Sequence, residues 1–117
     1  MERRAGTREA EQAVFERASE IIAAEFARPI RIEDVARRVA VSPRQLQRVF
    51  ADVEGVGFRA YLCELRMAHA AELLGSTDLP VKDVAARVGY RDASQFGKAF
   101  KRVHGVSPSQ ARTGGRA

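Results

Sequence analysis

An internal repeat constrains the fold of this chain more than any other feature of its sequence. Residues 33–57, EDVARRVAVSPRQLQRVFADVEGVG, align with residues 82–107, KDVAARVGYRDASQFGKAFKRVHGVS. Matching residues lie 49 positions apart as far as Val39 and 50 positions apart from Gln45 onward, because the second copy has one more residue in its turn. Self-similarity over this length predicts two copies of one structural unit in a single chain.

Helical periodicity extends beyond the repeat. Apolar residues recur every four positions at the start of the chain, at Ala10, Val14, Ala18, Ile22 and Phe26. That helix should end at Arg28-Pro29, since a residue before proline is disfavoured in the α region. Sustained strand alternation and hairpin turn sequences are nearly absent. The sequence therefore predicts an all-α fold of about seven helices, at 8–27, 32–39, 43–54, 58–74, 81–88 and 93–104, with a short turn after Pro108.

Polar residues mark the start of the second helix in each copy. Ser42 is the predicted N-cap of the helix at 43–54, Pro43 suits its first position, and Gln45 completes a capping box. Asp92 aligns with Ser42 and is the predicted N-cap of the helix at 93–104.

The repeat also predicts how the chain is organised. Each copy has a short helix, a tight turn and a second helix, which is the helix-turn-helix arrangement of homeodomain-like units. We expect the first helix-turn-helix unit at 8–57, a long linker helix at 58–75 that Gly75 closes, and the second unit at 76–112. Residues 1–7 and 113–117 are predicted to be disordered.

The positive charge of the chain is local. The net charge is +5 and the isoelectric point is about 10.1. From Arg91 to the C-terminus six basic residues stand against one acidic residue, Asp92, whereas the first 90 residues hold 14 of each sign. A basic segment of this kind indicates a polyanionic partner.

Each second helix has an apolar face and a polar face. The residues predicted to face the core are Leu46, Val49, Phe50 and Val53 in the first copy and Phe96, Ala99, Phe100 and Val103 in the second. In a helix-turn-helix unit the second helix enters the DNA major groove, where arginine pairs with guanine and glutamine with adenine. The residues expected to contact double-stranded DNA are Arg44, Gln47, Arg48, Ser94, Gln95, Lys98, Lys101 and Arg102.

These motifs resemble the AraC/XylS family of transcriptional regulators. The resemblance rests on DVAARVGYRDASQFGKAFKRVHGVSP, on VSPRQLQRVF and on YLCELRMAHAAELL with Arg66 and Ala70, and it covers about residues 10–112. It implies a bacterial, sequence-specific DNA-binding domain whose two recognition helices, 43–54 and 93–104, enter successive major grooves. It also implies RNA polymerase as a protein partner. Arg66 is expected to be structural, bonding helix ends between the two units.

Three positions depart from the family pattern. Ala40 stands where glycine is common and is strained if its φ is positive. Gly97 aligns with Gln47, so the second recognition helix lacks a long side chain there. Ala111 stands where the family often has a tyrosine before the final arginine, a difference that bears on how the terminal helix packs. We therefore expect the first recognition helix to discriminate bases and the second to supply mainly backbone affinity.

Other chemical classes find little support in the sequence. Cys63 is the one cysteine, so it cannot form an internal disulfide or the cysteine cluster that DNA alkyl-transfer repair requires. His69 and His104 lack the spacing of metal ligands, so no metal is expected. No phosphate-binding loop, nucleophile elbow or catalytic carboxylate pair is evident, so neither enzymatic activity nor a cofactor is expected.

Location and alternatives follow from what the sequence contains. No apolar run approaches the roughly 18 residues that cross a bilayer, and no secretory signal is evident, so we expect a cytoplasmic protein without a membrane partner. The sequence holds no effector-sensing domain, which fits a stand-alone regulator or the DNA-binding part of a longer protein. A basic helical adaptor and a non-specific DNA-binding module are the alternative functions.

Overall fold

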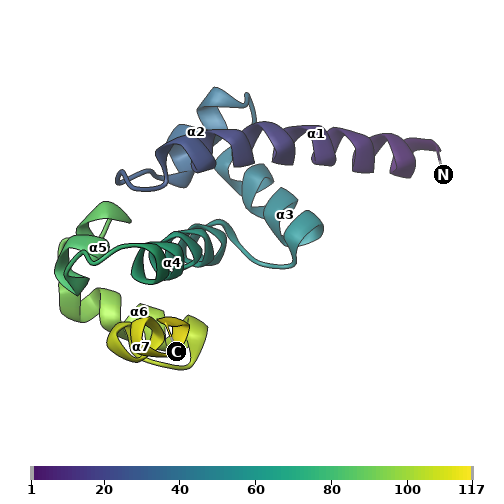
Figure 1. Cartoon of the computed structure of the whole chain (residues 1–117). Coiled ribbons are helices and arrows are strands. Elements are labelled where there is room, and N and C mark those ends of the chain that lie inside the picture. The colour runs from purple at the N-terminus through teal and green to yellow at the C-terminus, as the bar shows by residue number, and fades with distance from the viewer. Residues whose placement is uncertain (1, 117) are drawn as a thin grey trace. The chain divides into compact units, whose positions relative to one another are not determined.

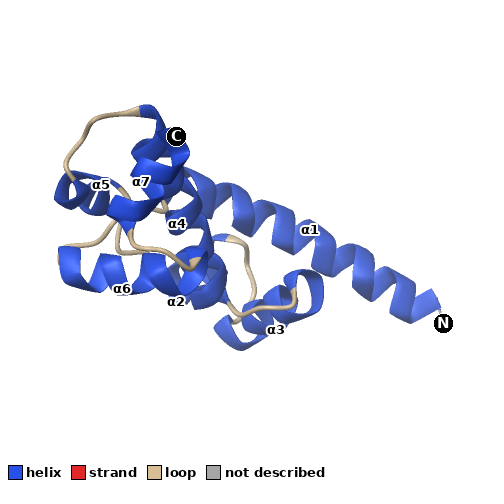
Figure 2. Cartoon of the chain, turned by 60° about the horizontal axis from the view of Figure 1, so that its bottom comes forward, coloured by secondary structure: helices blue, strands red, loops and turns tan. Residues whose placement is uncertain are grey.

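The computed structural model describes residues 2–116, and the side chains of residues 7–114 within them. This part of the chain consists of helices and loops without a strand, as Figure 2 shows. The seven helices, which Figure 1 follows from purple to yellow, are α1 (Glu2–Glu25), α2 (Ile32–Arg38), α3 (Pro43–Glu54), α4 (Phe58–Ser76), α5 (Val81–Arg87), α6 (Ala93–His104) and α7 (Pro108–Arg116). The predicted all-α class is confirmed. No helix in this part of the chain is long and apolar enough to span a bilayer.

The helix bounds differ from the prediction at the ends of α1 and α4. Helix α1 ends at Glu25, two residues early, because the carbonyl groups of Phe26 and Arg28 face the guanidinium of Arg66 instead of continuing the helix. Helix α4 continues through Gly75 to Ser76. The hydroxyl of Thr77 donates to the carbonyl of Leu73, which satisfies a helix-end acceptor without a glycine cap.

Helices also reach into both segments for which disorder was predicted. Helix α1 begins at Glu2 and α7 ends at Arg116. The first of these segments contains Glu2, Arg3, Arg4 and Ala5, which have high helix propensity. Residues 1 and 117 of the predicted disordered ends lie outside the described residues.

The chain divides into two compact units. The first unit comprises Met1–Glu25 and Ile30–Leu62, and the second comprises Phe26–Pro29 and Cys63–Ala117. The division falls inside α4, so the predicted linker helix is not a separate spacer. Phe58 and Leu62, in its first turns, are buried in the first unit, whereas Met67, Ala70 and Leu74 further along α4 are buried in the core of the second.

Aromatic side chains hold the first unit together. The ring of Phe50 on α3 lies 5.3 Å from that of Phe15 on α1, 5.8 Å from that of Phe58 and 5.1 Å from that of Tyr61 (centroid distances). Phe50 is completely buried. The recognition-type helix α3 is therefore fixed to α1 and to the start of α4 by one aromatic cluster.

The second unit is built around Met67 and Phe96, both fully buried. Helix α7 packs on this core through Ala111, and the Nε of Arg112 donates to the carbonyl of Leu74 at 3.1 Å. Ala111 is thus partly buried against the core of the second unit. The prediction that Val103 faces the core is wrong, because 38% of this residue is exposed.

Candidate nucleic-acid interface

The turn between the two helices has the same geometry in both units. In the first unit the N–H of Val41 donates to the carbonyl of Ala36 at 3.0 Å, and in the second the N–H of Tyr90 donates to that of Ala85 at 2.9 Å. Ala40 has a φ of 61°, which confirms the predicted strain at this alanine, and the aligned glycine has a φ of 101°. This matching also identifies Arg91 as the residue that lengthens the second turn, since Ser42 and Asp92 align as N-caps.

The side chain of Arg66 packs against the turn of the second unit. Its Nε donates to the carbonyl of Phe26 at 2.7 Å, and its Nη2 donates to that of Arg28 at 2.9 Å. A Cβ added at Gly89 would lie 3.0 Å from the carbonyl oxygen of Ala27 and 3.1 Å from the guanidinium carbon of Arg66. The structural role of Arg66 is confirmed, but the prediction that it bonds helix ends between the two units is wrong, because Phe26, Arg28 and Arg66 all belong to the second unit.

Both predicted N-caps are confirmed. Ser42 Oγ accepts from the N–H of Gln45 at 3.0 Å, and one carboxylate oxygen of Asp92 accepts from the N–H groups of Ser94 at 2.7 Å and Gln95 at 3.3 Å. Among the hydrogen bonds of the described residues, the side chain of Gln45 does not return a bond to Ser42, so the full capping box predicted there is wrong. These caps fix where each recognition helix begins.

The exposed basic side chains of α3 lie in its N-terminal half. Arg44 and Arg48 are exposed, opposite buried Leu46 and Val49. The C-terminal half instead carries Asp52 and Glu54, both exposed, and its last turn has no basic residue. Phosphates are therefore favoured near the first two turns of α3 and repelled near the last.

Helix α6 has the opposite charge pattern along its length. Ser94, Gln95 and Lys98 are exposed in its first half, and Lys101 and Arg102 are exposed in its last turn. Arg102 also donates from Nη2 to the sulfur of Cys63 at 3.7 Å, so its guanidinium lies over the second unit's own surface. The whole length of α6 is thus free of acidic side chains.

A thiol and a phenol lie beside this arginine. The sulfur of Cys63 is 3.8 Å from the hydroxyl oxygen of Tyr90, and the guanidinium of Arg66 lies 5.8 Å from the Tyr90 ring centroid. Burial raises the pKa of Tyr90, Cys63 adds to the rise, and Arg66 and Arg102 oppose it. Tyr90 therefore stays protonated and can act as a hydrogen-bond donor in this cluster.

Gln47 differs from the other residues predicted to contact DNA. Its Oε1 accepts from the N–H of Phe58, the first residue of α4, at 2.9 Å. The aligned residue Gly97 has no atom within 4 Å of an added Cβ. Sequence reasoning missed this bond, because eleven residues separate its partners and one of them is a backbone group.

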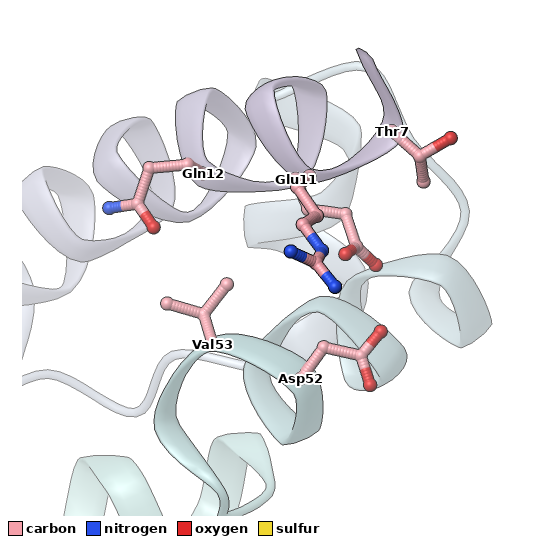
Figure 3. Close-up of a pocket in the computed structure, with 6 residues that line it drawn as sticks. Thr7, Glu11, Gln12, Asp52 and Val53 are labelled. Carbon is pink, nitrogen blue, oxygen red and sulfur yellow. The ribbon is translucent and has the colours of Figure 1, made fainter. Parts of the chain in front are cut away.

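A pocket of about 570 Å³ lies between α1 and α3 of the first unit. Figure 3 shows Glu11 of α1 and Asp52 of α3 pointing their carboxyl groups into it. Burial, followed by a hydrogen bond and the charge of Asp52, raises the pKa of Glu11, and the charge of Arg48 lowers it. The repeat did not reveal this pair, because Glu11 lies outside it.

The two units differ in net charge. The first holds ten basic and ten acidic residues, whereas the second holds ten basic and five acidic residues. The ion pairs Arg31–Glu33, Arg37–Asp34 and Arg38–Glu25 belong to the first unit. No group of three or more metal-ligating side chains lies together in the described residues.

The fold and these surfaces define two helix-turn-helix units, and comparison with known proteins agrees. A helix-turn-helix domain family matches residues 35–114. The chain is 46% identical over 77 residues to an HTH-type transcriptional regulator of Mycobacterium tuberculosis; the match covers 66% of this chain and 22% of the relative. The matched part of this chain therefore spans about a fifth of that relative's length.

Solved structures are similar over most of the chain. The C-terminal domain of AraT, a response regulator from Geobacillus stearothermophilus, is 40% identical with a TM-score of 0.82, covering 86% of this chain and 84% of that one. The DNA-binding domain of AdpA, a global transcriptional factor crystallised with a target DNA, is 28% identical with a TM-score of 0.78, covering 86% and 93%.

The chain belongs to the AraC-type helix-turn-helix family of DNA-binding transcriptional regulators. Members of this family are not, in general, enzymes.

Proposed function

We propose that this domain recognises a specific double-stranded DNA sequence by placing α3 and α6 in successive major grooves. The carrying observation is that each is the second helix of a helix-turn-helix unit, with its anchoring residues buried and cationic or amide side chains exposed opposite. Similarity to the AdpA domain, whose structure contains its target DNA, supports the proposal. Because one chain carries two recognition helices, a monomer can bind an asymmetric DNA site.

In this proposal α3 discriminates bases. Arg44 and Arg48 lie in the first two turns, which is the part of a recognition helix that reaches base edges. A guanidinium pairs with two acceptors of guanine at once, which discriminates against other bases by about 1–3 kcal/mol. Asp52 and Glu54 keep the C-terminal half of α3 away from phosphates, so the contact of this helix is confined to its start.

Helix α6 supplies mainly affinity for the DNA backbone. Lys98, Lys101 and Arg102 would contact phosphates, and Ser94 and Gln95 would contact bases or phosphates from the first turn. We add Arg91, the exposed residue that lengthens the second turn, as a further phosphate contact beside the N-cap. The charge of +5 on the second unit supports this assignment.

Binding to selected DNA tests the proposal. Sites are first selected from random duplexes, and the best site is then titrated against unrelated competitor DNA at a stated salt concentration. The proposal predicts binding to the selected site at least about 10³-fold tighter than to the competitor. Equal affinity for all sequences would contradict it and favour a basic adaptor or a non-specific DNA-binding module.

RNA polymerase is the protein partner that we propose, and the cytoplasm is the proposed location, both from membership of this family of bacterial regulators. In vitro transcription from a promoter carrying the selected site tests the partner. A change in transcript yield that requires the site supports it, and unchanged yield at saturating protein contradicts it.

A further inference from the structure

We propose that Gln47 positions the recognition helix α3 on the start of α4 and does not read adenine. This inference rests on the proposed function, because it concerns how α3 is held for DNA recognition. The first N–H groups of a helix have no partner inside the helix, and a buried one left unpaired is costly. Phe58 is the first residue of α4 and is buried, and Gln47 Oε1 accepts its N–H at 2.9 Å.

The orientation of the amide follows from chemistry. A backbone N–H can only donate, so the group of Gln47 that faces Phe58 must be the oxygen. Adenine pairing requires the oxygen and the nitrogen of the amide together on one edge. Because Oε1 already accepts from Phe58, pairing with adenine would require the same oxygen to accept a second hydrogen bond on its other lone pair while the NH₂ faces the base.

The second unit serves as an internal control for this assignment. The residue that aligns with Phe58 is Pro108, which has no N–H and therefore requires no acceptor. The residue that aligns with Gln47 is Gly97, and no atom lies within 4 Å of a Cβ added there. Glutamine occurs where the following helix has an N–H to satisfy and is missing where it has none.

The two units start the following helix by different means. In the second, Ser107 Oγ accepts from the N–H of Gln110 at 3.1 Å, and Gln110 Oε1 accepts from the N–H of Ser107 at 2.9 Å, which is a complete capping box. In the first, glycine occupies position 57, and a Cβ there would lie 2.8 Å from Gln47 Oε1. Gly57 thus leaves room for a cap that comes from α3.

The test compares Gln47→Leu with Gln45→Leu. Gln45 is an exposed glutamine of the same helix whose side chain forms no hydrogen bond among the described residues, so it controls for losing an amide from α3. We expect amide exchange of Phe58 to be about tenfold faster in the Gln47→Leu protein and unchanged in the control. Equal exchange rates in the two variants would overturn the bond.

Binding to a panel of single-base variants of the selected site gives the second readout. If Gln47 positions α3, Gln47→Leu weakens discrimination at every base pair read by this helix while the order of preference stays the same, and pairs read by α6 are unaffected. Selective loss of preference at one A·T pair would show that Gln47 reads adenine and would overturn the proposal.

Gln47→Glu keeps the test decisive if the leucine variant fails to fold. A carboxylate can accept from Phe58, so slow exchange should be retained in this variant and a rapid rate would contradict the proposal. The exchange measurements require no DNA. If the wild-type protein proves non-specific, the proposed function fails while the assignment of Gln47 is still decided.

Discussion

The first and second units share one helix-turn-helix geometry but differ in how their charges are arranged. The first unit has equal numbers of basic and acidic residues, whereas the second carries the whole net charge of +5. The recognition helices differ in the same way, because α3 ends with Asp52 and Glu54 while α6 ends with basic residues. Duplication has thus kept the scaffold and changed the electrostatics of its exposed face.

This difference suggests that the two helices have different tasks. Non-specific affinity for DNA grows with the number of phosphates that lysine and arginine neutralise, and α6 is suited to that along its length. Sequence is read at base edges, which two arginines at the start of α3 can reach. Gln47 and Gly97 do not support this division, since their difference is explained by the N–H of Phe58 and its absence at Pro108.

The largest expected effect on stability comes from a substitution in the turn of the second unit. Gly89→Ala should destabilise the protein by about 3 kcal/mol, because alanine disfavours a φ of 101° and its Cβ would press on the guanidinium that binds two carbonyls. Thermal and urea unfolding measure the loss. A free energy of unfolding within about 0.5 kcal/mol of the wild type would contradict this account of the second turn.

Removing one basic side chain should affect DNA binding differently in the two units. Lys101→Ala on α6 should lower affinity for every sequence about fivefold and reduce the slope of log affinity against log salt by about one. Arg17→Ala, on α1 in the first unit, is the charge-matched control and should leave the slope unchanged. An equal change of slope in both variants would mean that the effect reflects net charge and not a contact of α6.

Substitution at Ala40 should change the free energy of unfolding in the opposite direction from substitution at the aligned glycine. Ala40→Gly should raise the free energy of unfolding by about 0.5–1 kcal/mol, since glycine accepts a φ of 61° without steric cost. Urea titration detects a change of this size. Lower stability in this variant would show that the loss of chain entropy outweighs the relief of strain.

The acidic pair of the first unit predicts a small effect of pH. The folded-state pKa of Glu11 is raised above 4.5, so folding favours its protonated form and this contribution is lost as pH rises through the raised value. Glu11→Gln should therefore make the free energy of unfolding less dependent on pH in that range. Above that range, the variant should be about a few tenths of a kcal/mol more stable than the wild type. A pH series of urea unfolding at constant ionic strength checks this, and an unchanged pH profile would contradict it.

The sequence predicted the helices well because their determinants are local. Four-residue apolar spacing, the caps Ser42 and Asp92 and the strained Ala40 all depend on a few neighbouring residues, and the structure confirms each. The exposure of Val103 could not be predicted in the same way. It depends on which helix covers the end of α6, whereas in the first unit α1 packs on α3.

The candidate interface was predictable in outline only. The exposed arginines and lysines follow from the helical wheel, since a charged residue opposite a buried anchor has nowhere else to lie. The bond from Gln47 to Phe58 and the pair Glu11–Asp52 join segments brought together by packing, and one partner of the first is a backbone group. Neither leaves a pattern in the sequence around it.

The most direct test compares base preferences of the wild type, Arg48→Ala and Lys98→Ala on a complete panel of single-base variants of the selected site. The account predicts that Arg48→Ala flattens discrimination by about 1–3 kcal/mol at the base pair that it reads. Lys98→Ala should instead lower affinity almost equally for all sequences. If Lys98→Ala relaxes base preference more than Arg48→Ala does, the division of tasks between the two units is contradicted.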